Sequence, residues 1–235
     1  MDDLFGSALL DYQQGGYSED ITIYSSLDEE DELSVPYLFR NFDGMPKLEQ
    51  KALSLCKGKV LDIGAGAGSH SLFLQKKGYD VTALDYSKGA VNTCMLRGIK
   101  NTVHADIYHF ENEKFDTLLL LMNGIGIVGE MNKLGVFFQR MKSLLNHDGQ
   151  ILLDSSDIIY MFEKDDDGGY WVPDTGAYYG EVEFYMEYRN QKSNPFKWLY
   201  IDYRTLQFEA RANGLNCELV QHGEHYDYLA RLWPS

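Results

Sequence analysis

The stretch that decides the fold is Val-Leu-Asp-Ile-Gly-Ala-Gly-Ala-Gly, residues 60–68, in which a short apolar strand runs into a loop with three glycines. Glycines let a loop bring its backbone N–H groups against a ligand, because side chains would obstruct the approach. Asp85 follows at the end of the next predicted strand, where a carboxylate can accept two hydrogen bonds from a ribose diol. The strand, the loop and the later acid together predict a nucleoside-containing ligand.

Apolar strands and amphipathic helices alternate around this stretch. We expect strands at 60–63, 80–85, 101–106, 115–122 and 150–154. We expect helices at about 69–77, from Ser87 to just before Gly98, and at roughly 130–146. Such alternation predicts a mostly parallel sheet covered on both faces, and right-handed crossovers make it a doubly wound α/β fold.

The segments outside this region have a different composition. Residues 1–45 are acidic and aromatic, and we interpret them as an N-terminal helical lid. Residues 181–188 and 196–201 alternate in polarity and predict an inserted β-hairpin. The remaining expected elements are a helix at 46–56, a helix at 203–213 and strands at 216–221 and 226–232. The predicted organisation is a lid at 1–45 and a ligand-binding domain at 46–235, with an inserted hairpin region at about 155–203.

The charge of the chain limits its partners. The 235 residues carry a formal net charge of −15, from 21 Lys and Arg against 36 Asp and Glu. Binding to nucleic acid needs a basic face, and no cluster of three Lys or Arg occurs in the sequence. No apolar run approaches the roughly 20 residues of a membrane span. Nucleic acid and membrane are therefore not expected as partners, and a neutral or cationic small molecule is favoured.

The cysteines and the first residues predict the cellular compartment. Cys56, Cys94 and Cys217 form no CxxC pair, which is typical of free thiols in a reducing environment. The chain opens Met-Asp-Asp, without a basic region or cleavage signal. We expect a cytoplasmic protein. His222 and His225 lack identifiable further ligands, so no metal site is predicted.

The glycine spacing separates two kinds of nucleotide site. Dinucleotide enzymes usually carry G-x-G-x-x-G, whereas this chain has Gly64, Gly66 and Gly68, with Ser69 at the last position of that pattern. Residues 61–68 resemble motif I of the class I S-adenosylmethionine-dependent (SAM-dependent) methyltransferases. The later motifs of that family are similar to Leu84-Asp85-Tyr86-Ser87, His104-Ala105-Asp106-Ile107, Phe115-Asp116 with Asn123-Gly124, and Leu144-Leu145 through Gly149-Gln150-Ile151-Leu152. The resemblance covers about residues 45–155 and implies a seven-stranded Rossmann-like sheet, SAM as cofactor and transfer of a methyl group.

The resemblance also implies roles for single residues. The loop with Gly64, Ala65, Gly66 and Gly68 would pass close to the methionine part of SAM, and Asp62 would orient its amino group. Asp85 would hold the ribose, and Tyr86 would lie against the adenine. The remaining implied contacts are those of Ala105, Asp106 and Ile107 with the adenine, of Asn123 and Gly124 with the region of the sulfonium, and of Arg40 with the ligand carboxylate.

Two other function classes compete with this interpretation. Tyr160 and Lys164 form Tyr-x-x-x-Lys, which resembles the catalytic pair of short-chain dehydrogenases and would indicate an NAD-dependent oxidoreductase. Their spacing from the glycine loop is shorter than that family uses. A non-catalytic SAM-binding regulatory module would bind SAM and transfer nothing.

The acceptor site is expected beyond the fifth strand, because ligands of open α/β sheets bind outside the carboxyl ends of the strands. Asp154 and Asp157 stand there, and either can hold an amine or act as a general base; alternatively they cap the following turn. Aromatic residues crowd the inserted region, among them Tyr170, Trp171, Tyr178, Tyr179, Tyr185 and Tyr188. They suit a small cationic or aromatic acceptor, but they can also pack the hairpin on the sheet or form a dimer interface. Both a monomer and a homodimer are compatible with the sequence.

Overall fold

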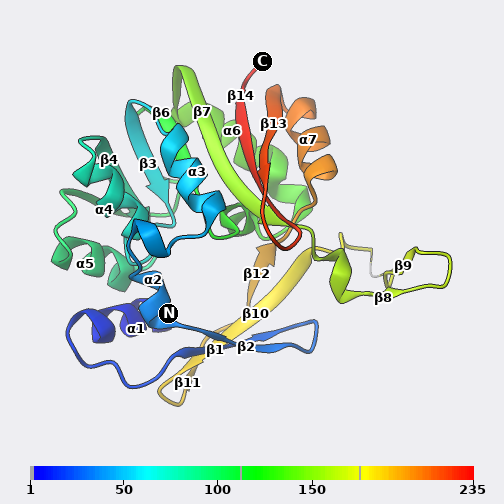
Figure 1. Ribbon diagram of the computed structural model, residues 1–235, viewed down its shortest axis with the longest axis horizontal. Coiled ribbons are helices and arrows are strands. Elements are labelled where there is room, and N and C mark those ends of the chain that lie inside the picture. The colour runs from blue at the N-terminus through cyan, green and yellow to red at the C-terminus, as the bar shows by residue number, and fades with distance from the viewer. Residues whose placement is uncertain (1–2, 112, 175) are drawn as a thin grey trace.

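A computed structural model describes residues 3–111, 113–174 and 176–235, and its largest element is a seven-stranded sheet (Figure 1). The strand order is β13-β14-β7-β6-β3-β4-β5. Their bounds are β3 Lys59–Ile63, β4 Asp80–Asp85, β5 Asn101–His104, β6 Phe115–Leu120, β7 Leu145–Ser156, β13 Leu215–His222 and β14 Asp227–Pro234. Strands β3 to β7 run parallel, whereas β14 runs antiparallel to both β7 and β13. The predicted doubly wound, mostly parallel sheet is confirmed.

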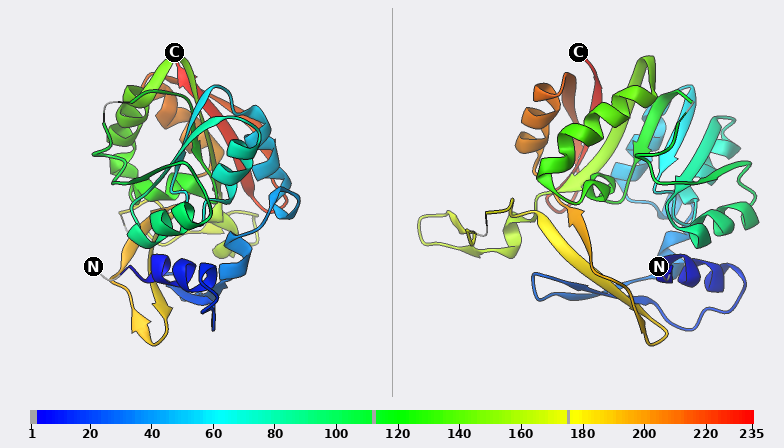
Figure 2. Two further views of the ribbon diagram at one scale, coloured as in Figure 1. Left: turned by 90° about the vertical axis from the view of Figure 1, so that its left-hand side faces the viewer. Right: turned by 180° about the vertical axis from the view of Figure 1, so that it is seen from behind.

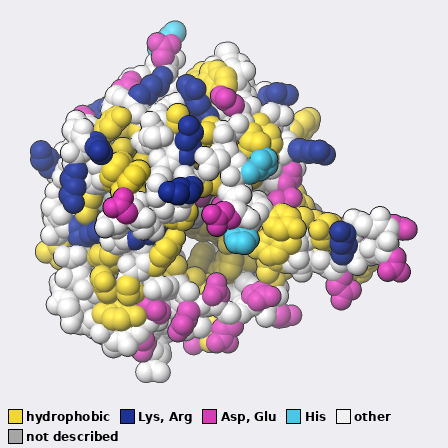
Figure 3. All heavy atoms as spheres, in the orientation of Figure 1, with side chains coloured by type: hydrophobic (Ala, Val, Ile, Leu, Met, Phe, Trp, Pro, Cys, Tyr) yellow, Lys and Arg dark blue, Asp and Glu magenta, His cyan; other side chains and the backbone are white. Residues whose placement is uncertain are grey.

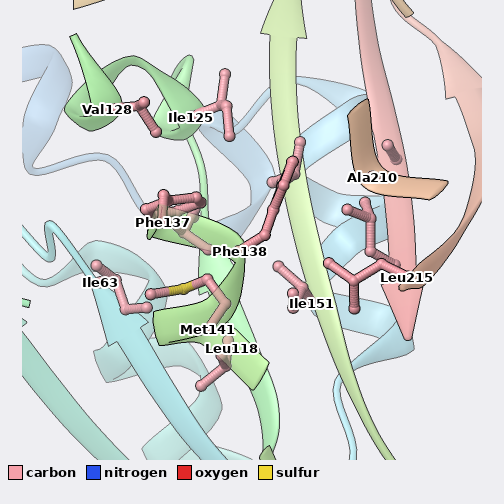
Figure 4. Packing of buried hydrophobic residues seen from close by; sticks show 14 of the residues in the cluster. Ile63, Leu118, Ile125, Val128, Phe137, Phe138, Met141, Ile151, Ala210 and Leu215 are labelled. Carbon is pink, nitrogen blue, oxygen red and sulfur yellow. The ribbon is translucent and has the colours of Figure 1, made fainter. Parts of the chain in front are cut away.

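Helices cover both faces of this sheet, because successive residues of its buried strands point to opposite sides. Leu118 packs in one core cluster with Phe137 and Met141 of α6 (Figure 4), whereas Leu119 packs in another with Leu53 of α3. The helices are α3 Lys47–Leu55, α4 Ser69–Lys76, α5 Lys88–Leu96, α6 Leu134–Leu144 and α7 Tyr203–Ala212. None of the helices in the described part of the chain combines the length and apolarity that a membrane crossing requires.

A second, antiparallel sheet joins the N-terminal segment to residues 181–199. β1 (Ile21–Ser25) pairs with β10 (Glu181–Tyr188), so that Thr22 lies opposite Glu187. The other strands of this sheet are β2 Glu30–Leu33, β11 Gln191–Lys192 and β12 Phe196–Leu199. It lies below the seven-stranded sheet in Figure 1. The predicted hairpin of residues 181–188 and 196–201 is therefore present, with β12 ending at Leu199.

The N-terminal segment, which the sequence predicts to be helical, is helical only in part. It contains the helices α1 Leu4–Gln13 and α2 Val35–Leu38, but residues 21–33 form the hairpin of β1 and β2. β-branched and aromatic residues at 21–24 favour a strand, and β10 supplies a partner that lies too far along the chain for local pattern to identify. Residues 1–2 of the predicted lid lie outside the described residues.

Residues 158–171 form an arm that projects from the body of the molecule (Figure 2). It consists of the 3₁₀ turn η4 Ile158–Met161 and a short hairpin of β8 Glu163–Lys164 with β9 Tyr170–Trp171. It follows β7 directly, at the carboxyl end of the strand where the acceptor site is predicted.

Candidate functional site

The glycine loop connects β3 to α4 with three left-handed residues. The φ angles are 74° at Gly64, 55° at Gly66 and 79° at Gly68, a region that L side chains rarely adopt. A Cβ added at Gly68 would meet the side chain of Ile99 and lie 2.8 Å from Cys94 Sγ, whereas at Gly64 it would meet no atom within 4 Å. Gly68 is thus needed for packing, and Gly64 faces open space in which a ligand can approach the backbone.

Asp85 joins the glycine loop to the start of α5. Its Oδ2 accepts from Gly66 N–H at 2.8 Å and its Oδ1 accepts from Ser87 N–H at 2.8 Å. Burial raises the pKa of this carboxyl, and the two backbone donors partly oppose that rise. A carboxylate has about four acceptor positions, so two remain for hydroxyl groups of a ligand.

The residues that follow β5 lie beside Asp85. Ala105 N–H donates to the backbone oxygen of Asp85 at 3.1 Å. The Asp106 carboxylate accepts from Tyr108 N–H at 2.9 Å, and Ile107 is buried. Tyr86 is 67% exposed, which leaves its ring free to cover a flat ligand. The structure therefore gathers the predicted adenosine contacts at the ends of β4 and β5.

Asp62 lies deeper than the other predicted contacts. Its side chain is 2% exposed, and its Oδ2 accepts from Ser71 Oγ at 2.7 Å. Burial raises the pKa of this carboxyl. Asp62 thus stands beneath the glycine loop, on the side of the sheet that faces α3.

Asp154 holds the loop that follows β6. Met122 and Asn123 are non-glycine residues with φ angles of 66° and 55°. The Asp154 carboxylate accepts from Met122 N–H at 3.1 Å and from Gly124 N–H at 3.0 Å, which fixes this strained turn. Burial raises the pKa of Asp154 to about 6. The sequence predicts that Asp154 either takes part in the chemistry or caps the turn that follows β7. In the structure its carboxylate caps the loop after β6 and not that turn.

A cavity of about 240 Å³ opens beside Asp154 and Asn123. Its other lining residues are Tyr37, Pro46, Leu48, Glu49, Met122 and Asp227. Figure 3 shows the molecule hollowed between the body around the seven-stranded sheet and the antiparallel sheet below it, with acidic side chains along the lower rim. The cavity therefore combines carboxylates, an aromatic ring and an amide at the carboxyl ends of β6 and β7.

Asp157 contacts the residues that follow β7 and not the cavity. Its Oδ1 accepts from Tyr179 OH at 2.7 Å and from Ile159 N–H at 2.9 Å, so it caps η4, and it does not line the cavity. Tyr160 stacks on Tyr226 with ring centroids 4.9 Å apart, while Lys164 lies over another ring, that of Tyr170. Tyr160 and Lys164 thus have separate partners. Among the described residues, no group of three or more His, Cys, Asp or Glu is placed to hold a metal ion.

Two comparisons with known proteins agree with this geometry. A family described as "Methyltransferase domain" matches residues 61–153. The crystal structure of a SAM-dependent methyltransferase from Bacteroides fragilis in complex with S-adenosyl-L-homocysteine (SAH) is 42% identical. That match covers 99% of this chain and 95% of the other, with a TM-score of 0.92. The chain belongs to the SAM-dependent methyltransferases.

A partial sequence match and a shared fold connect this methyltransferase to two other proteins. A glycine/sarcosine N-methyltransferase of Aphanothece halophytica is 31% identical over 104 residues, which are 41% of this chain and 39% of that protein. The match thus spans well under half of that relative's length. The CcbJ methyltransferase of Streptomyces caelestis has the same fold over 100% of both chains, with a TM-score of 0.66 at 12% identity. The enzyme uses SAM as its cofactor, and the comparisons favour neither the dehydrogenase nor the non-catalytic alternative.

The sequence did not reveal one buried network of this methyltransferase. Arg40 of the N-terminal segment donates to Glu49 of α3 at 2.6 Å, and Glu49 is also 2.8 Å from His70 Nε2 of α4. Burial alone would raise the pKa of Glu49, but His70 and Arg40 together lower it. The sequence feature that could have indicated this network is Glu49, a charged residue next to Leu48 on the apolar face of an amphipathic helix. The network fixes the N-terminal segment to the body beside the cavity.

Proposed function

We propose that this enzyme transfers the methyl group of SAM to the nitrogen of a small amine, and that the amine binds in the cavity beside Asp154. The observation that carries the proposal is the buried Asp154 carboxyl in the cavity wall, whose pKa is raised to about 6. Asp227 adds a second acidic group, and Tyr37 contributes a ring to the same wall. Carboxylates and aromatic faces favour a cationic or aromatic acceptor.

In this proposal SAM lies across the carboxyl ends of β3, β4 and β6. Gly64, Ala65, Gly66 and Gly68 pass beside its methionine part, with Asp62 beneath them. Asp85 holds the ribose. The remaining proposed contacts are those of Tyr86, Ala105, Asp106 and Ile107 with the adenine, and those of Asn123 and Gly124 near the sulfonium. The open space at Gly64 and the free acceptor positions of Asp85 support this placement.

The reaction is an in-line displacement. The nitrogen lone pair forms the new bond to the methyl carbon, and the electron pair of the carbon–sulfur bond passes to sulfur, which leaves neutral SAH and an N-methylated ammonium. A protonated amine has no free lone pair, so one proton must leave nitrogen before the attack. Asp154 takes this proton, because a carboxyl whose pKa is raised to about 6 is a stronger base than an ordinary aspartate. Alignment in the cavity supplies the rest of the rate enhancement.

We further infer that residues 1–45 act as a lid on the domain formed by residues 46–235, and that the region 155–203 roofs the acceptor. The contact of β1 with β10 supports the idea that lid and roof act together. Buried free thiols at Cys56, Cys94 and Cys217 suit the cytoplasm. The proposed assembly is a monomer or a homodimer, which light scattering after size-exclusion chromatography distinguishes.

The test uses labelled SAM and a panel of glycine, sarcosine, ethanolamine, histamine and tyramine, with phenol and benzoate as oxygen acceptors. We expect methylation of one or more amines and of neither oxygen acceptor. Asp154→Asn should lower kcat at least a hundredfold and abolish the acidic limb of the pH–rate profile near pH 6. Asp157→Asn is the matched control and should retain activity. Transfer to oxygen only, or an unchanged pH profile in Asp154→Asn, contradicts the proposal.

A further inference from the structure

One carboxylate caps two helices that are far apart in the sequence. Asp3 precedes α1, and its Oδ1 accepts from Gly6 N–H at 3.0 Å. Its Oδ2 accepts from Gly89 N–H at 2.8 Å and from Ser87 Oγ at 2.9 Å, at the start of α5. The negative charge thus lies at the N-terminal ends of both helices, where the helix dipoles favour it.

The two helices touch through glycines. A Cβ added at Gly89 would lie 2.5 Å from the Cα, C and O atoms of Gly6. A Cβ added at Gly6 would overlap the side chains of Asp3 and Ser87. Because both positions lack side chains, α1 can rest directly on the first turn of α5.

This crossing places α1 against the cofactor-binding loop. Phe5, the second residue of α1, lies 3.7 Å from the position that a Cβ would take at Gly66. Ser87 connects the crossing to Asp85, since Ser87 N–H donates to the Asp85 carboxylate at 2.8 Å. At the other end of α1, Asp11 accepts from Tyr188 OH at 2.8 Å and forms an ion pair with Arg189. Helix α1 therefore spans from the glycine loop to β10.

We propose that Asp3 is a positioning residue that holds α1 across the cofactor site, so that SAM enters and SAH leaves only when this contact opens. The inference rests on the proposed placement of the cofactor at Gly66 and Asp85. Asp3 touches no reacting atom. It acts through Ser87 and Gly89, and the ring of Phe5 covers the loop while the contact is closed.

The test measures association and dissociation rates of SAH on the immobilised full-length enzyme by surface plasmon resonance. We expect Asp3→Ala to raise the dissociation rate at least tenfold and the association rate at least twofold, because an open lid admits and releases the ligand faster. Asp20→Ala is the matched control. Asp20 is also a carboxylate of the N-terminal segment, but it accepts from Val35 N–H and Tyr17 OH instead of α5, so both rates should stay within twofold of wild type.

Two further measurements separate a lid from a damaged site. Hydrogen exchange of the α1 amides in the SAH complex should accelerate in Asp3→Ala and in Asp3→Asn, because the single amide oxygen of Asn cannot replace both carboxylate oxygens that accept from Gly6 and Gly89. An unchanged dissociation rate, or a faster dissociation with a slower association, overturns the inference. Asp85→Ala tests the cofactor placement by itself: if that variant loses SAH while both Asp3 variants behave as wild type, the placement holds and the lid inference fails.

Discussion

Gly64 and Gly68 have almost the same backbone conformation, yet their surroundings predict opposite effects of one substitution. The φ angles are 74° and 79°. An alanine in the left-handed region costs about 1–2 kcal/mol in either place. At Gly68 the new Cβ also meets Ile99 and Cys94, and overpacking of this kind adds about 1–3 kcal/mol. At Gly64 it meets nothing within 4 Å.

We therefore expect Gly68→Ala to lower the free energy of unfolding by about 2–5 kcal/mol and Gly64→Ala by only about 1–2 kcal/mol. The order reverses for the ligand. Gly64→Ala fills the space beside the cofactor and should weaken SAH binding at least tenfold, about 1.4 kcal/mol. Folded Gly68→Ala should bind SAH with an affinity closer to that of wild type than Gly64→Ala does.

Urea unfolding without ligand and isothermal titration calorimetry with SAH measure the two quantities on the same preparations. Each variant serves as the control for the other, because both add one methyl group to a left-handed glycine. If Gly64→Ala binds SAH as tightly as wild type, the open space at Gly64 does not face the cofactor. If Gly68→Ala is no less stable than Gly64→Ala, the packing argument is refuted.

Two further predictions concern carboxylates. Asp85→Ala removes the acceptors for the ribose. Two charge-assisted hydrogen bonds of about 1.5–3 kcal/mol each predict at least a hundredfold loss of SAH affinity in calorimetry, whereas Tyr160→Phe should change the affinity little. Equal affinities in wild type and both variants would remove the ribose assignment. Asp154 has a pKa of about 6 in the folded protein against about 3.9 unfolded, so between about pH 4 and pH 6 the folded state binds more protons and stability falls as the pH rises. Urea unfolding should show wild type losing about 2 kcal/mol over that window relative to Asp154→Asn, and parallel pH curves would contradict the raised pKa.

The part of the fold that rests on local pattern was predictable. The strand at 80–85 and the strand at 181–188 have the predicted bounds, because polarity period and flanking turn residues define them. The pairing of β1 with β10 could not be predicted, because nothing near Ile21 in the sequence identifies a partner so distant along the chain. β7 begins at Leu145, earlier than expected, because Phe115 of β6 supplies a pairing partner there.

The candidate site also has a part that local sequence pattern predicts and a part that depends on contacts between distant segments. Glycines and acidic residues at strand ends predict a nucleoside site, because the chemistry of that ligand restricts residue type and position. Sequence could not distinguish Asp154 from Asp157, which stand three residues apart at the end of one strand. Their neighbours decide: Asp154 turns to the loop at Met122 and Gly124, and Asp157 turns to Tyr179. The Arg40–Glu49–His70 network depends on three separate elements meeting in space.

The pairing of β1 with β10 has a consequence for the order of folding. Strands β3 to β7 all lie between the two partners in the sequence, and contacts of such long sequence separation form slowly. During synthesis the residues of β1 leave the ribosome long before β10 exists, whereas the parallel core can assemble from neighbouring units. The parallel strands β3 to β7 are therefore available before β1 can pair with β10, which requires residues 181–188, and β13 and β14 complete the seven-stranded sheet later still.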